Sequence, residues 1–194
     1  MTPGAHIQST LELLDTLWSG STPPKQLLNN WFRKRRYVGS SDRRAIKGHF
    51  YTVLRHRARL DWWINRYMRG DIPSARTRLI AYLILKVRVN PDVICNYFSG
   101  AQYCPPELNY NEKRLVVSLS GKGLHHIDMP THVAFEFPAW MERSLYALWG
   151  ETLHEELTAL NIPAPVDIRV NTLKSTRHQV KRLLESASII THET

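Results

Sequence analysis

The sequence predicts a mainly α-helical fold that is followed by the start of a small α/β unit. Through about the first two-thirds of the 194 residues, apolar side chains recur every three or four positions, which is the spacing of amphipathic helices. At residues 166–171 the pattern changes to strict alternation, which is typical of a half-buried strand. A chain of this length corresponds to one or two domains.

The first helices are indicated by their apolar stripes and by the residues that bound them. Residues 7–18 place one apolar stripe inward and end before the Gly- and Pro-containing residues 20–24. Residues 27–32 begin a second inward-facing segment, which continues until Gly39. Residues 40–42, Ser-Ser-Asp, form an N-cap cluster for a long helix whose basic side chains lie largely off its apolar face. One face of that helix can therefore pack while another contacts phosphates.

The middle of the chain contains the most apolar helix. A preceding helix passes through residues 62–64, and Ser74 is expected to cap the next one. That next helix carries the apolar residues of segment 79–87, and we predict that it is the central core helix. Short helices are expected within residues 91–100 and 112–119.

The carboxy-terminal part changes in character from helical to mixed. Helices are expected over residues 138–150, opened by a proline at the tolerated first turn, and over residues 151–160. A strand at residues 166–171 is followed by a helix capped by Ser175 and by a second strand at residues 189–191. This strand–helix–strand unit is too small to bury a sheet alone.

Three parts follow from these expectations. We predict a helical domain at residues 1–124 and a connector at residues 125–137, within the least regular stretch of the chain. Residues 138–194 then form an incomplete α/β domain.

Positive charge is concentrated in one region. Between positions 33 and 88 there are 16 basic and three acidic residues, whereas the rest of the chain has a small acidic excess. Guanidinium forks donate two hydrogen bonds to one phosphate, and clustered cations gain from counterion release. RNA or another polyanion is the expected partner, and a merely solvated helix face is the alternative. A membrane partner is disfavoured because the aromatic residues do not line one apolar face.

Catalytic, cofactor and metal motifs are not found in the sequence. There is no G-x-G-x-x-G pattern, and Gly121-Lys122-Gly123 lacks the other residues of a phosphate-binding loop. His125, His126 and His132 follow no metal-ligand spacing, so we expect no metal site. Two cysteines cannot build a disulfide framework, and neither a secretory signal nor a membrane-length apolar run is visible. We therefore expect a cytoplasmic protein.

Two separated stretches of the sequence resemble one family. Residues 35–44, Arg-Arg-Tyr-Val-Gly-Ser-Ser-Asp-Arg-Arg, with residues 53–55 and 60–63, resemble the NusB-like amino-terminal domain of bacterial Sun/RsmB-type proteins. Residues 137–140, Phe-Pro-Ala-Trp, and 168–174, Ile-Arg-Val-Asn-Thr-Leu-Lys, resemble the segment that precedes their catalytic domain. Those proteins are S-adenosylmethionine-dependent methyltransferases that act on cytosine C5 of ribosomal RNA. The resemblance covers essentially the whole chain and implies a NusB-like helical bundle that binds RNA.

The sequence differs from this family in its cofactor-binding and catalytic motifs. In the family a Gly-rich Rossmann-like motif holds S-adenosylmethionine, and cysteines in Pro-Cys and Thr-Cys contexts attack the cytosine and assist release. Here Cys95 follows Ile94, and Cys104 precedes a proline, so neither cysteine matches. No catalytic or cofactor residue is carried over, and the resemblance implies a catalytic domain beyond Thr194. We expect this chain alone to hold no cofactor and to be inactive.

Charge and resemblance together select the expected RNA-binding residues. They are Arg33, Lys34, Arg35, Arg36, Arg43, Arg44, Lys47, Arg55, Arg57, Arg169, Asn171 and Lys174. The last three fall in the region that the family places near the RNA entrance. Asn171 fits equally well as a turn residue that holds the end of the strand.

The sequence therefore predicts the RNA-binding amino-terminal portion of a ribosomal RNA cytosine-C5 methyltransferase. The alternative is a stand-alone NusB-like RNA-binding module that acts in transcription or ribosome assembly with a protein partner. A non-functional gene remnant is a third interpretation.

Overall fold

The computed structural model describes residues 1–68, 70, 72–162, 164 and 166–192, and it confirms the mainly α-helical class. The chain divides into two compact units, Met1–Asn161 and Ile162–Thr194. The first unit includes the expected connector, residues 125–137, and the helices that follow it. Compact units are not necessarily independent folding domains, so the three-part domain division stays a prediction.

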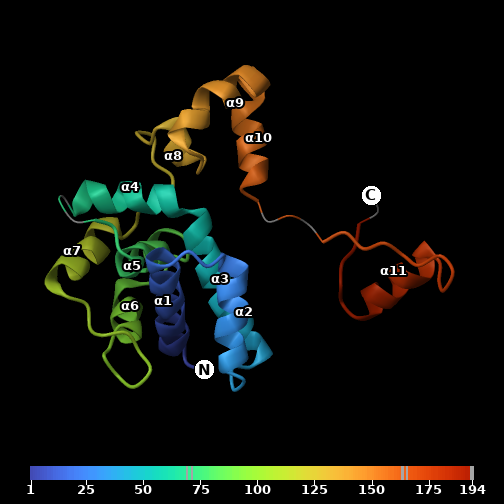
Figure 1. The fold of residues 1–194 in the computed structure, drawn as a ribbon, viewed down its shortest axis with the longest axis horizontal. Coiled ribbons are helices and arrows are strands. Elements are labelled where there is room, and N and C mark those ends of the chain that lie inside the picture. Colours follow the sequence, from blue (N-terminus) through green and yellow to red (C-terminus); the bar gives the residue numbers. More distant parts are fainter. Residues whose placement is uncertain (69, 71, 163, 165, 193–194) are drawn as a thin grey trace. The chain divides into compact units, whose positions relative to one another are not determined.

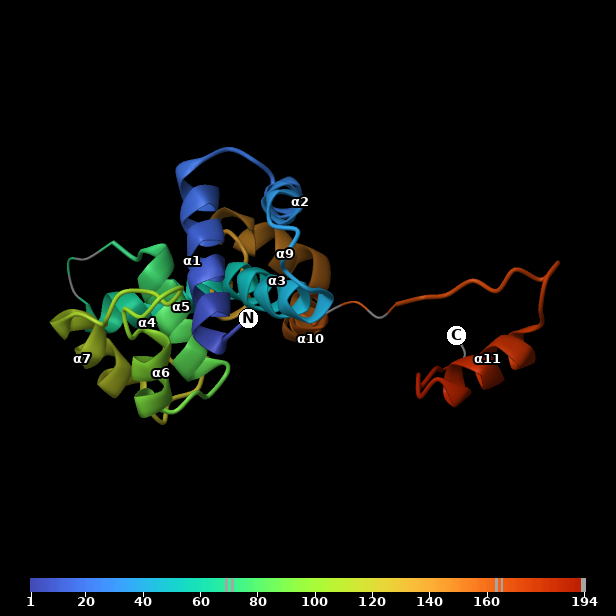
Figure 2. The same cartoon turned by 90° about the horizontal axis from the view of Figure 1, so that it is seen from below.

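Seven helices form the body of the first unit (Figures 1 and 2). They are α1 (Pro3–Ser19), α2 (Pro24–Lys34), α3 (Ser40–Arg55), α4 (Arg57–Tyr67), α5 (Ala75–Leu85), α6 (Pro91–Tyr97) and α7 (Tyr110–Leu119). Helix α5 contacts α1, α3, α4, α6 and α7, and every residue of α5 except Arg76 is buried. The predicted central core helix is therefore confirmed. Its cap is confirmed too, because Ser74 and Thr77 form a reciprocal capping box at its start.

The start of α3 differs in detail from the expected N-cap cluster. Gly39 occupies the N-cap position and makes no side-chain cap bond, and Ser40 is already the first helical residue. The apolar face of α3 places Ile46, Phe50 and Val53 in the core with no solvent exposure. This packing orients the basic residues of α3 toward the surface.

The second part of the first unit continues from α8 (Thr131–Ala134), which contacts α4. It then forms η1 (Ala139–Met141), α9 (Glu142–Trp149), η2 (Gly150–Thr152) and α10 (Leu153–Leu160). The Phe135 ring stacks on His154 of α10, with the ring centroids 4.9 Å apart. The Asn161 side-chain amide donates to the Phe135 carbonyl at 2.9 Å. These contacts hold α10 against the segment that leaves α8.

The second unit contains α11 (Arg177–Ser186), which begins with a capping box between Thr176 and Gln179. The helix was predicted at this place, with Ser175 as its cap, and the cap lies one residue later. The expected strands are not observed among the described residues, and residues 166–171 carry no strand assignment. A strand needs a neighbour that satisfies its backbone hydrogen bonds, and no strand in the described part of the chain pairs with these residues. In the part of the chain that the structure describes, no helix is long and apolar enough to cross a membrane.

Candidate nucleic-acid interface

Seven of the predicted RNA-binding residues lie where α2 ends and α3 begins. The backbone N–H of Arg35 donates to the Phe32 carbonyl at 3.1 Å and closes α2, and α3 begins five residues later at Ser40. Trp31 and Phe32 are buried on the inner face of α2 and anchor this junction. We call the seven cations the α2–α3 basic cluster: Arg33, Lys34, Arg35, Arg36, Arg43, Arg44 and Lys47.

Two members of the α2–α3 basic cluster contribute to the fold. The Arg35 guanidinium carbon lies 4.1 Å from the centroid of the Trp31 ring, and that of Arg43 lies 5.6 Å from the centroid of the Phe32 ring. Arg43 Nε also donates to the Val38 carbonyl at 2.9 Å. A cation over an aromatic face contributes about 0.5–1 kcal/mol at exposed sites. Part of the charge at these two positions is thus explained by packing of the α2–α3 junction.

Three other members are exposed and unneutralised. Lys34, Arg36 and Arg44 have no acidic partner within ion-pair distance among the described residues. The nearest acid in sequence, Asp42, instead accepts hydrogen bonds from His6 Nε2 at 2.8 Å and from the terminal ammonium group at 3.0 Å. The hydrogen bond from His6 and that from the ammonium group lower the pKa of Asp42. The Asp42 carboxylate therefore stays charged, but it pairs with His6 and the terminal ammonium group and not with these three cations.

Arg33 and Lys47 complete the α2–α3 basic cluster. Arg33 donates to Asn30 Oδ1 at 3.1 Å within α2, and Lys47 Nζ lies 5.4 Å from the Phe32 ring centroid. Both residues are exposed. Since neither has an acidic partner among the described residues, their charges add to the positive surface.

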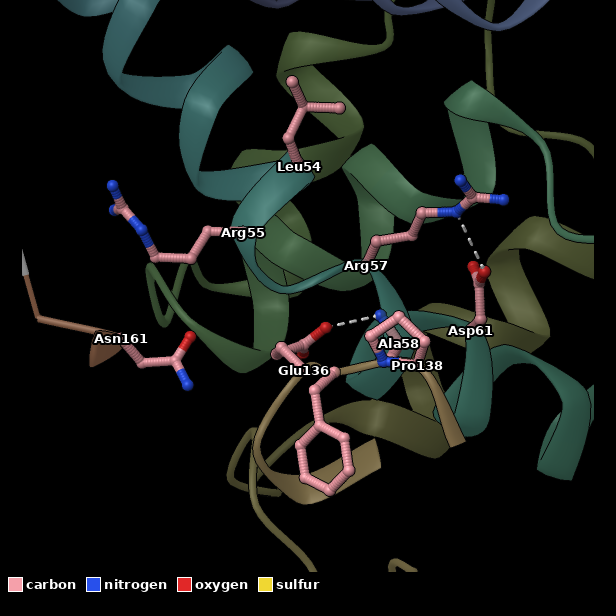
Figure 3. Close-up of a pocket in the computed structure, with 9 residues that line it drawn as sticks. Leu54, Arg55, Arg57, Ala58, Asp61, Glu136, Pro138 and Asn161 are labelled. Carbon is pink, nitrogen blue, oxygen red and sulfur yellow. Dashed lines mark hydrogen bonds and ion pairs between the residues drawn. The ribbon is translucent and has the colours of Figure 1, made fainter. Parts of the chain in front are cut away.

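Arg55, the last residue of α3, and Arg57, the first residue of α4, lie beside a cavity of about 550 Å³ (Figure 3). The cavity is lined by Leu54, Arg55, Arg57, Ala58, Asp61, Glu136, Phe137, Pro138 and Asn161. Arg57 Nε lies 3.6 Å from Asp61 Oδ2. The same carboxylate accepts two bonds from Arg78, at 2.5 and 3.0 Å. Arg55 is exposed and has no ion-pair partner in the described part of the chain.

Glu136 joins the segment after α8 to the start of α4. It accepts hydrogen bonds from the Ala58 N–H at 2.7 Å, the Arg59 N–H at 3.1 Å and Arg59 Nε at 2.9 Å. Two of these donors belong to the first turn of α4, where backbone N–H groups lack helical partners. Burial raises the pKa of Glu136, and its hydrogen bonds with Arg59 and Ala58 oppose that shift. Arg59 in turn donates to His56 Nδ1 at 2.7 Å, so that His56 accepts this bond as a neutral ring.

The remaining predicted residues, Arg169, Asn171 and Lys174, belong to the second unit and are exposed. Asn171 Oδ1 accepts from the Leu173 N–H at 3.1 Å. The Asn171 carbonyl accepts from the N–H groups of Lys174 and Ser175, at 3.0 and 3.1 Å. Asn171 therefore forms a turn before α11, and the strand whose end it was expected to hold is not observed among the described residues. An RNA contact by any of these residues stays a prediction.

Some residues at these sites were not predicted from the sequence. Glu136 was missed because its partners in α4 are more than seventy positions away, and no local pattern reports such a contact. Tyr51 and Gly48 were also missed. They fall on the same helical face as Arg44, Lys47 and Arg55, and the three- and four-residue spacing of the exposed residues is a signal that could have found them.

No metal or thiol centre is assembled in the described residues. No group of three or more His, Cys, Asp or Glu side chains there could hold a metal ion. Cys95 is exposed on α6, and Cys104 is half-buried in the following loop. The arrangement that the structure does build is a positively charged surface along α2 and α3, which can attract and hold an anionic polymer.

Comparison with known proteins identifies the carboxy-terminal segment. Residues 137–194 match the family model of the ferredoxin-like domain of RsmF/RsmB-like methyltransferases. No curated protein and no solved structure matches the chain significantly. The matched segment includes both stretches, residues 137–140 and 168–174, that resemble the pre-catalytic region of this family. The likeness to RsmF/RsmB-like methyltransferases is therefore shown for these 58 of the 194 residues.

Proposed function

We propose that residues 1–194 bind RNA for a ribosomal RNA cytosine-C5 methyltransferase, with the α2–α3 basic cluster as the main contact surface. The observation that carries the proposal is the exposure of Lys34, Arg36 and Arg44 with no acidic partner among the described residues. Cations without acidic partners keep their full charge for a phosphate backbone. Residues 137–194 match a domain of a methyltransferase family that acts on ribosomal RNA. This match favours RNA over other polyanions, and it favours a portion of a methyltransferase over a stand-alone module.

The proposed role is to bind and position RNA and not to carry out methyl transfer. Contacts from Lys and Arg to phosphates give affinity and orientation but read no base sequence. The excess of 13 positive charges between residues 33 and 88 supplies long-range attraction of the same kind. Arg55 and Arg57 extend this surface, and Arg169, Asn171 and Lys174 form a further proposed contact in the second unit.

The test compares two triple variants of the 194-residue chain. In the first, Lys34, Arg36 and Arg44 are replaced by glutamine. In the control, Lys113, Arg114 and Lys122 are replaced by glutamine, which removes equal charge near α7, away from α2 in both views (Figures 1 and 2). RNA affinity is measured by fluorescence anisotropy with a labelled ribosomal RNA fragment over about 50–200 mM salt.

The first variant is expected to bind more weakly and with a flatter salt dependence. Each lost phosphate contact lowers the slope of log K against log salt by about 0.7 for single strands, so three contacts lower it by about 2. The control variant is expected to keep most of the wild-type slope. Equal losses in both variants would show that only net charge matters and would contradict an assigned surface on α2 and α3.

A further inference from the structure

The outer face of α3 carries five exposed residues in one row. They are Arg44, Lys47, Gly48, Tyr51 and Arg55, and we call them the α3 stripe. Their positions follow the helical repeat, so they lie on one face, opposite the buried Ile46, Phe50 and Val53. The α3 stripe is about 16 Å long at 1.5 Å per residue. It runs from the α2–α3 basic cluster to the cavity beside Arg55.

An aromatic ring stands in the middle of the α3 stripe. Tyr51 is 38% exposed, although its ring centroid lies only 5.4 Å from that of the fully buried Phe50, in an edge-to-face arrangement. This contact holds the Tyr51 ring in position while leaving part of it open to solvent. Aromatic rings set among cations are the platforms on which proteins stack the bases of single-stranded nucleic acids.

Beside Tyr51 the α3 stripe contains a glycine that packing does not explain. A Cβ atom on Gly48 would have no neighbour within 4 Å, and the backbone there does not adopt the left-handed conformation. Glycine inside a helix is destabilising relative to alanine. A glycine becomes useful at such a place where another molecule approaches the helix backbone closely.

We propose that a single strand of RNA lies along the α3 stripe, with one base stacked on Tyr51 and the strand passing close over Gly48. Arg44, Lys47 and Arg55 then contact phosphates on either side of the stacked base. This inference rests on the proposed function and adds to it the form of the RNA and the contact mode. An A-form duplex keeps its bases stacked on one another and offers none to Tyr51.

The first test uses Tyr51→Leu, with Tyr51→Trp as the variant that retains an aromatic face. Tyr110→Leu on α7 is the matched control, because Tyr110 is also exposed and has a nearby arginine, Arg114. Each variant of the full chain is titrated with a single-stranded RNA of about 12 nucleotides and with the same sequence as a duplex. Circular dichroism and thermal unfolding show that each variant is folded.

Tyr51→Leu is expected to weaken binding of the single strand at least fivefold and to leave the salt slope unchanged, since no charge is removed. Tyr51→Trp and Tyr110→Leu are expected to bind as the wild type does. The duplex is expected to respond to none of the three. A Tyr51→Leu variant that binds the single strand normally, or loses affinity equally for the duplex, would overturn the stacking while leaving the proposed function intact. A wild-type chain that binds no RNA would overturn both.

The second test uses Gly48→Gln, which adds a side chain over the middle of the α3 stripe. Glutamine is a better helix former than glycine, so this variant is expected to unfold at a higher temperature and yet bind RNA several-fold more weakly. Val117→Gln places the same side chain on an exposed position of α7 and is expected to change neither affinity nor folding. Unchanged RNA affinity of Gly48→Gln would show that no strand passes over this position.

Discussion

Replacing Glu136 with alanine is expected to destabilise the first unit, because this carboxylate satisfies three donors at the start of α4. The donors are the N–H groups of Ala58 and Arg59 and the guanidinium of Arg59. Glu136 and Arg59 retain only 8% and 15% of their side-chain exposure, so water replaces the lost bonds poorly. The variant therefore leaves a nearly buried cation without its anion.

The expected loss follows from the burial of this pair. Removing one partner of a fully buried ion pair costs about 3–5 kcal/mol. Arg59 keeps its hydrogen bond to His56 and some contact with water, so we expect about 2–3 kcal/mol for Glu136→Ala. At about 2–4 °C per kcal/mol for a chain of this size, the unfolding midpoint should fall by about 4–12 °C.

The assay is thermal unfolding followed by circular dichroism at neutral pH. Glu136→Gln keeps an oxygen acceptor and is expected to lose less stability than Glu136→Ala. Glu156→Ala removes an exposed glutamate of α10 and is expected to change the free energy of unfolding by less than about 0.5 kcal/mol. A midpoint shift for Glu136→Ala no larger than that of the Glu156 control would refute the account of this contact.

One further prediction concerns the pH dependence of folding stability. Another concerns which residues of the α2–α3 basic cluster stabilise the fold and which bind RNA. Burial and nearby cations lower the pKa of His56 to about 4. His56 therefore takes up a proton near pH 6.5 in the unfolded chain but only near pH 4 in the folded chain. The free energy of unfolding falls as the pH is lowered through this window, by up to about 3 kcal/mol. Denaturant unfolding at a series of pH values should show that His56→Asn loses less free energy of unfolding on acidification than the wild type does. An equal loss in both would contradict the role of His56. Arg43→Gln should lower the unfolding midpoint more than Arg44→Gln does. Arg44→Gln should weaken RNA binding more than Arg43→Gln does. The reverse order would show that the assignment of Arg43 to the fold is wrong.

Local sequence signals predicted the helices well where the cap and the apolar stripe lie in one segment. The helix after Ser74 is an example, because its cap, its apolar run and its burial all agree. The strands expected at residues 166–171 and 189–191 did not form, since a strand depends on a partner that lies elsewhere. Alternation of side chains reports a tendency to be extended and not the presence of that partner.

In the candidate site, too, features that depend on neighbouring residues were predicted, and features that depend on distant contacts were not. Charge density located the α2–α3 basic cluster, because it requires only that cations be close in sequence. It did not separate Arg35 and Arg43, which pack on rings, from Lys34, Arg36 and Arg44, which are free of acidic partners in the described residues. That distinction depends on where Trp31 and Phe32 are buried and therefore on the folded structure.

The central claim is that RNA lies against α2 and α3. Ultraviolet cross-linking of the 194-residue chain to a single-stranded RNA, followed by mass spectrometry of the peptides, tests it most directly. We predict adducts in residues 33–55, with Tyr51 among the modified positions. Adducts confined to α7, or spread evenly over the chain, would contradict the claim.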